Sequence, residues 1–218
     1  MREAYTDQLD SIFDDLVGIS RRVEVAVRDA TEALLTGNVQ LAEQVISRDA
    51  VIDASRERVE DTAFSLLSLQ QPVAGDLRTI VAALRMVSEL ERMGDLAAHV
   101  AKIARLRVPD IAVPDTAEPT IRRMAEVAES MVQSVAGIIE HRDVDAAADL
   151  RKADEEMDTL RRTGFRELLG NNWEHGVEPA VDVALLGRYY ERIADHAVSI
   201  ANRVIFVVTG EHPPKHDD

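Results

Sequence analysis

The sequence predicts an all-α protein of six helices, arranged as two duplicated, pseudo-symmetric three-helix bundles. Of its 218 residues, 46% are hydrophobic but only 4% are aromatic, a balance typical of helical rather than β-rich chains. Apolar residues recur at steps of three and four along most of the chain, which is the helical period. The sequence motif Glu-Arg-x-x-Asp occurs twice, at 91–95 and 191–195, and is followed each time by small and apolar residues. The chain is therefore expected to contain an internal repeat.

Three helices are expected in the first half. Gly37 is expected to cap the C-terminus of the first helix, and Asn38 to begin the second. The second helix is expected over about 39–69 and the third over about 77–106, with a break at the proline and glycine between them. The buried seam of the first helix is expected to comprise Leu9, Phe13, Leu16, Ser20, Val23, Val27, Ala30 and Leu34.

The second half repeats this plan after a stretch that holds three prolines, 108–120. Proline removes a backbone donor and disfavours the helical conformation in the residue before it, so this stretch is expected to be a linker. The last two helices are expected over about 144–169 and 181–208. The predicted units are a first bundle at 1–108, a linker at 109–119, a second bundle at 120–209 and a disordered tail at 210–218.

Charge and composition limit the classes of partner. Forty acidic and 25 basic residues give a net charge of −15, so a nucleic acid would be repelled, whereas cations and basic protein surfaces would be attracted. A strong anion site is not expected for the same reason. The absence of cysteine excludes thiolate metal ligands. Neither a signal peptide nor an apolar run of about 20 residues occurs, so a cytoplasmic protein without direct membrane insertion is expected.

Acidic residues recur in register between the halves. At an offset of 105, Asp49 and Asp53 match Asp154 and Asp158, and the repeated motif supplies a second pair in each half. Residues four apart share one face of a helix, with about 5–6 Å between their Cβ atoms. Each half is therefore expected to carry two carboxylate pairs, on its second and third helices. The four pairs are Asp49–Asp53, Glu91–Asp95, Asp154–Asp158 and Glu191–Asp195.

Three interpretations of these acids remain open. Asp49 lies on the apolar seam of its helix, and Glu91 and Glu191 lie on rows of glycine and alanine. Acids placed toward such rows need compensation for their lost hydration. They could line a solvated face with Glu–Arg pairs, or together hold a hard or borderline divalent cation. They could also pair in the interior with arginines that are near in sequence, namely Arg48, Arg92, Arg161 and Arg192.

Signatures of catalysis are scarce. The sequence has no glycine-rich phosphate loop and no Glu-x-x-His motif of the di-iron bundles. An all-helical, divalent-metal-dependent phosphohydrolase or nucleotide hydrolase is left as the alternative function. His99 and His196 lie beside the acidic pairs but outside the repeated positions, so incidental roles are expected for both. The side chain of Trp173 is expected to pack inside its own loop.

The stretches "ELERMGDLAAHVAKIA" at 89–104 and "YYERIADHAVSIANRV" at 189–204, each preceded by an Asp-x-x-x-Asp helix, resemble the duplicated signature of the PhoU family. The resemblance covers about 5–209, and an actinobacterial-type member is expected. It implies a cytoplasmic, often dimeric negative regulator of the phosphate-starvation response, not an enzyme. Such proteins modulate phosphate uptake and link the ATPase subunit of the phosphate ABC transporter to the sensor histidine kinase of a two-component system.

The resemblance also implies that the acidic pairs hold a divalent or transition metal, with Mg, Mn, Zn and Fe as the candidates. One departure from the family pattern is Ala194, which stands where the first repeat has Gly94, so the two sites are expected to differ in affinity. Phosphate itself is expected to be held by the transporter. The implied ligands are Asp49, Asp53, Glu91, Asp95, Asp154, Asp158, Glu191 and Asp195.

Overall fold

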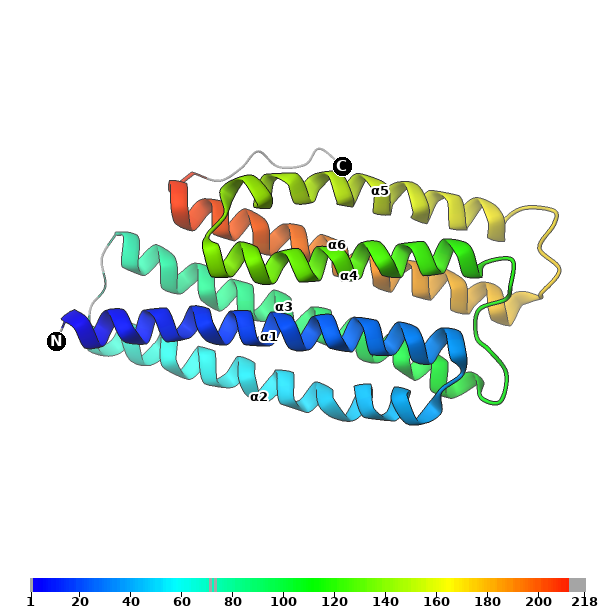
Figure 1. Ribbon diagram of the computed structural model, residues 1–218, viewed down its shortest axis with the longest axis horizontal. Helices are drawn as coiled ribbons and strands as arrows, with labels where there is room; N and C mark the ends of the chain where they lie inside the picture. Colours follow the sequence, from blue (N-terminus) through cyan, green and yellow to red (C-terminus); the bar gives the residue numbers. More distant parts are fainter. Residues whose placement is uncertain (1, 71, 73, 212–218) are drawn as a thin grey trace.

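A computed structural model describes residues 2–211 except 71 and 73, and it shows six long antiparallel helices (Figure 1). The predicted all-α fold of two three-helix bundles is confirmed. No helix in the described part of the chain is long and apolar enough to cross a bilayer. The helices are α1 (Arg2–Thr36), α2 (Val39–Gln70), α3 (Gly75–Arg107), α4 (Glu118–His141), α5 (Val144–Leu168) and α6 (Val177–Thr209).

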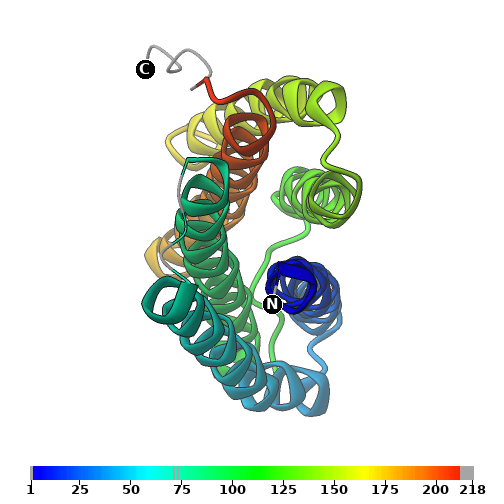
Figure 2. The same cartoon turned by 90° about the vertical axis from the view of Figure 1, so that its left-hand side faces the viewer.

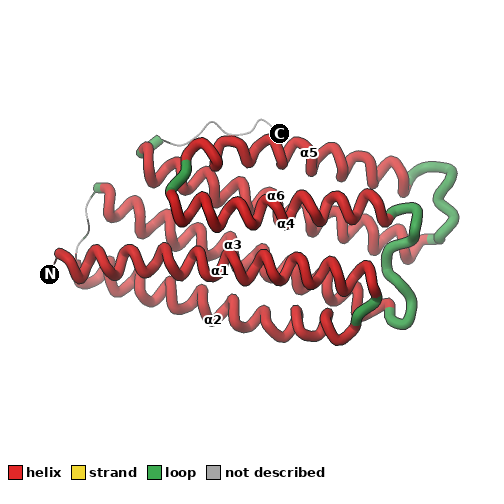
Figure 3. Tube along the Cα trace, in the orientation of Figure 1, coloured by secondary structure: helices red, strands yellow, loops and turns green. Residues whose placement is uncertain are grey.

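The two bundles lie side by side and share one interior. Helices α1, α2 and α3 pack against one another, as do α4, α5 and α6. The end-on view shows α3 beside α6 and α1 beside α4, with α2 and α5 at the outer edges (Figure 2). The α1–α2, α3–α4 and α5–α6 connections gather at one end of the molecule (Figure 3). The second and third helices of each repeat, which carry the acidic pairs, are therefore neighbours.

The duplication extends to the helix caps. Asn38 accepts a hydrogen bond from the backbone N–H of Leu41 at 3.1 Å, and Asp143 accepts one from Ala146 at 2.9 Å. Both side chains thereby satisfy an N–H group that has no partner within its helix. Gly37, with a φ of +67°, ends α1 as predicted. The same cap chemistry thus fixes the start of the second helix in both repeats.

Two helices that hold a proline in their first turn begin earlier than the sequence predicts. Helix α4 begins at Glu118, inside the predicted linker, and α6 begins at Val177, four residues before its expected start. Pro119 and Pro179 both fall in a first helical turn, where a missing N–H costs no intrahelical bond. Pro119 and Pro179 therefore open a helix, whereas Pro109 and Pro114 lie in the connection between α3 and α4 as predicted. Of the predicted tail, 212–218 lie outside the described residues.

Buried contacts join the two halves. The seam predicted for α1 is buried from Phe13 to Leu34, whereas Leu9 is partly buried. Tyr190 of α6 is fully buried, and its hydroxyl lies 2.8 Å from Oγ1 of Thr31 on α1. At the end of α3, the guanidinium of Arg107 donates two hydrogen bonds to Asp182 of α6, at 2.6 and 3.1 Å. The repeats are therefore held together by both apolar and polar contacts.

Candidate metal sites in the two repeats

The first acidic cluster, defined as Asp49, Asp53, Glu91 and Asp95, forms where α2 approaches α3 closely. Gly94 permits this approach. A Cβ at that position would lie 2.9 Å from Cδ1 of Ile52 and 3.3 Å from Oδ1 of Asp49. The structure brings the four predicted side chains close enough that the charges of Asp53, Glu91 and Asp95 all act on Asp49.

Charge in the first acidic cluster is poorly compensated. Burial first, and then the charges of Asp95 and Asp53, together raise the pKa of Asp49 to about 6. The pKa of Glu91 is also raised, chiefly by burial and then by Asp95. The charges of Arg56 and Lys102 oppose the rise in pKa of Glu91 and Asp49, respectively, without an ion pair to either acid in the described part of the chain. Among the described residues, Arg92 is the arginine in ion-pair contact, 3.3 Å from Asp95 and 3.6 Å from Glu91, with 61% of its side chain exposed. An ion pair this exposed stabilises little, so the cluster keeps an excess of negative charge.

The second acidic cluster, defined as Asp154, Asp158, Glu191 and Asp195, is arranged differently. Glu191 is only 7% exposed, and its two carboxylate oxygens accept hydrogen bonds from Arg161, at 2.7 Å, and from Arg188. The pKa of Asp195 is raised by partial burial and by Asp158, and Arg188 opposes that rise. Arginine thus satisfies the buried acid of this repeat, as one of the three interpretations expected.

The two clusters differ in how well they suit a cation. Among the described residues, no three acidic or histidine side chains converge on one point as they are placed. The first cluster nevertheless offers oxygen donors of raised pKa whose ion-paired arginine, Arg92, is largely exposed, and this suits a hard divalent cation. In the second cluster, a cation would compete with Arg161 and Arg188 for the oxygens of Glu191. All eight residues remain predicted ligands, and the first cluster fits a metal better.

The histidines near the clusters make contacts of their own. Nδ1 of His99 lies 2.7 Å from the backbone oxygen of Asp95, and its ring stacks on Tyr189 with 5.5 Å between centroids. Nδ1 of His196 lies 2.6 Å from Oε2 of Glu89, across the α3–α6 interface. The charge of His196 also opposes the raised pKa of Asp195 in the second cluster, and the incidental roles of both histidines stay predictions.

Other predictions from the sequence have mixed outcomes. Trp173 is half-buried and donates a hydrogen bond to the Gly176 carbonyl at 2.7 Å, so it does pack inside its own loop. Arg48 lies 3.4 Å from Asp29 of α1 instead of pairing within the first cluster. The reasoning from sequence missed Arg188, although its position three residues before Glu191 was an available signal.

Comparison with known proteins places this fold in a defined class. The family model "PhoU domain" matches residues 16–104 and 121–204, one match in each repeat. The chain is 46% identical over 213 residues to the phosphate-specific transport system accessory protein PhoU homolog 2 of Mycobacterium tuberculosis, which covers 98% of this chain and 100% of that protein. It is 41% identical to PhoU homolog 1 of the same species, over 100% of this chain and 98% of the relative.

A solved structure shows the same architecture. The crystal structure of PhoU from Pseudomonas aeruginosa superposes with a TM-score of 0.89 at 29% identity, covering 95% of this chain and all of the other. The chain belongs to the PhoU family. The mycobacterial relatives confirm the expected actinobacterial type, and the non-enzymatic accessory role of the family confirms that the chain is not an enzyme.

Proposed function

We propose that this protein represses the phosphate-starvation response when phosphate is plentiful. It links the ATPase subunit of the phosphate ABC transporter to the sensor histidine kinase and so modulates phosphate uptake. It acts in the cytoplasm as a homodimer, and its partners bring it to the inner face of the membrane. The relatives named as accessory proteins of phosphate-specific transport, which match nearly the whole chain, are the main support. The hydrolase alternative has no such support.

The acidic clusters are the proposed metal sites. In each repeat the ligands are the four carboxylates of the cluster, and Mg or Mn suits this oxygen donor set better than Zn or Fe. The first cluster binds the ion more tightly because Glu191, in the second, is already paired with Arg161 and Arg188. A bound cation would offset both the burial of Asp49, which chiefly raises its pKa, and the added repulsion from Asp95 and Asp53.

Deletion of the gene, together with any close copy in the same genome, tests the regulatory role. Alkaline phosphatase output in phosphate-rich medium is expected to become constitutive, and the wild-type chain is expected to restore repression. Repression that persists in the deletion strain would refute the proposed function. Direct binding of the purified protein to the ATPase subunit and to the kinase then separates the two partners.

Paired variants test the metal sites. Asp49→Asn with Asp95→Asn should reduce Mn²⁺ binding, measured by calorimetry, more than Asp154→Asn with Asp195→Asn does. Circular dichroism checks that both variants keep their helices. Equal losses would contradict the proposed difference between the repeats, and unchanged binding in both would contradict the sites themselves. Sedimentation equilibrium tests the dimer.

A further inference from the structure

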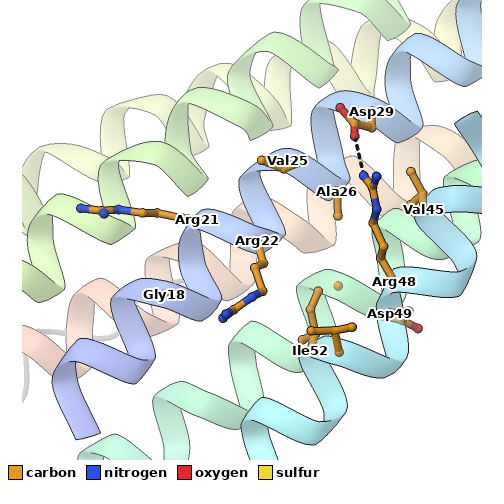
Figure 4. Close-up of a pocket in the computed structure, with 12 residues that line it drawn as sticks. Gly18, Arg21, Arg22, Val25, Ala26, Asp29, Val45, Arg48, Asp49 and Ile52 are labelled. Carbon is orange, nitrogen blue, oxygen red and sulfur yellow. Dashed lines mark hydrogen bonds and ion pairs between the residues drawn. The ribbon is translucent and has the colours of Figure 1, made fainter. Parts of the chain in front are cut away.

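A cavity of about 470 Å³ opens between α1 and α2, with α3 beneath it (Figure 4). Its walls come from residues 18–29 of α1 and 45–52 of α2, and Gly94 of α3 lines its floor. Eleven residue steps along α1 correspond to a length of about 16 Å. The volume lies in the range of small-molecule sites, about 300–1,000 Å³.

Small and apolar side chains make the middle of this cavity. Ala26 of α1 points toward Val45 and Ile52 of α2 across it, and Val25 also borders it (Figure 4). None of these four side chains brings a polar group, so the middle of the cavity favours an apolar body.

An arginine without an acidic partner marks one end. Arg22 points from α1 into the space between the helices (Figure 4), and its Nη1 lies 3.5 Å from where a Cβ on Gly18 would stand. Within the described residues, Arg22 forms no hydrogen bond or ion pair, whereas Arg21 is paired with Glu140 at 3.1 Å. Arg22 is exposed, so water solvates its guanidinium, and a carboxylate, sulfonate or phosphate group could replace that water.

The other end of the cavity carries acidic side chains in addition to an arginine. There Asp29 and Asp49 border the cavity, with Arg48 lying 3.4 Å from Asp29. An anionic group is repelled from that end unless Arg48 shields it. A ligand with one anionic group would therefore place it beside Arg22 and its apolar body in the middle.

The second repeat shows that the fold does not require this cavity. At an offset of 105, Ala26 corresponds to Met131 and Arg22 to Val127, which are 1% and 5% exposed. Gly18 corresponds to Arg123, which bridges α4 to α5 through Glu156 at 2.7 Å. Gly18, Arg22 and Ala26, which shape the cavity in the first repeat, are thus replaced by larger or uncharged residues or by a paired arginine in the second.

We propose that this cavity binds a small amphipathic anion, with an apolar body and one carboxylate, sulfonate or phosphate group. A small ligand is favoured over an acidic polypeptide because the net charge of −15 repels a partner in proportion to its own negative charge. Inorganic phosphate alone would leave the apolar walls uncovered. The cavity borders the first acidic cluster at Asp49, but the inference does not rest on the proposed regulatory function.

Titration of the full-length protein with 1-naphthyl phosphate and with octanoate, in EDTA, tests the inference by calorimetry. Saturable binding of at least one probe is expected, with no detectable heat from inorganic phosphate at the same concentrations. Ala26→Met, which copies the second repeat, should weaken binding at least about tenfold by filling the cavity. Arg22→Gln should weaken it about tenfold and reduce its dependence on salt.

Arg123→Gln in the second repeat is the matched control and should bind each probe as the wild type does. Thermal melts establish that all three variants fold. The inference is overturned if neither probe binds up to about 1 mM, a limit of roughly −4 kcal/mol. It is also overturned if Ala26→Met and Arg22→Gln bind like the wild type, or if inorganic phosphate binds as well as 1-naphthyl phosphate.

Discussion

The hydrogen bond between Tyr190 and Thr31 allows a prediction about the interface between the repeats. The hydroxyl of Thr31 also lies 2.8 Å from the Val27 carbonyl, to which it donates. The Tyr190 hydroxyl is therefore the donor in the pair, and Oγ1 of Thr31 is its acceptor. Tyr190→Phe removes the donor and leaves a threonine that keeps its bond to Val27. Thr31→Val instead leaves a tyrosine hydroxyl with no partner in a fully buried position.

These two substitutions should differ in cost. Tyr190→Phe loses one hydrogen bond and should lower the free energy of unfolding by about 0.5–1.5 kcal/mol. Thr31→Val leaves the buried hydroxyl of Tyr190 without an acceptor and should lower the free energy of unfolding by about 1–3 kcal/mol. The double variant has neither group, so it should be no less stable than Thr31→Val alone. Urea unfolding followed by circular dichroism measures all four corners of this cycle.

Two results would refute this reasoning about the Tyr190–Thr31 hydrogen bond. If Thr31→Val costs no more than Tyr190→Phe, the tyrosine hydroxyl finds another partner or water, and the interface is looser than its burial indicates. If the two costs add in the double variant, the pair is not coupled. The m-value must stay constant across the series for these comparisons to hold.

Two further predictions concern the acidic clusters. Folding raises the pKa of Asp49 from 3.8 to about 6, so this carboxyl favours the folded state least above pH 6 and most below pH 4. Asp49→Asn should therefore raise the free energy of unfolding at pH 7.5 in EDTA, measured by urea titration. The gain should be well under the roughly 3 kcal/mol of the full pKa shift because solvent screens this partly exposed group, and it should vanish by pH 4. An advantage that does not change with pH would contradict the assigned cause. Arg161→Ala should lower the melting temperature more than Arg92→Ala, because Glu191 is buried and the partners of Arg92 are more exposed. Equal shifts in differential scanning calorimetry would show that burial of the pair does not matter.

Much of the fold could be predicted from the sequence because its signals are local. The apolar seam of α1, the caps at Asn38 and Asp143, and the repeated acidic motif each depend on residues within a few turns of one another. Prolines misled the prediction of where α4 and α6 begin, since a proline that ends one helix and a proline in the first turn of another look alike in a single sequence.

The candidate site could be predicted only in part. Spacing of four residues placed each pair on one face, and glycine and alanine rows indicated which helices approach. The partner of each arginine could not be predicted, because a long side chain can reach several acids and the choice depends on packing between helices. Arg48 thus lies against Asp29 in α1, although it precedes Asp49 directly in the chain. The cavity beside Arg22 depends on small residues from three helices, which no local pattern brings together.

The single interior shared by the two bundles has a consequence for the origin of the chain. A half-length ancestor with only α1, α2 and α3 would expose the apolar faces that now pack against α4 and α6. Such a protein would need a second copy of itself to cover them, as a two-fold dimer. Fusion through the proline-containing segment gives that copy a high effective concentration and makes the pairing independent of protein concentration. Once fused, the two copies were free to diverge, one keeping an open groove and the other filling it.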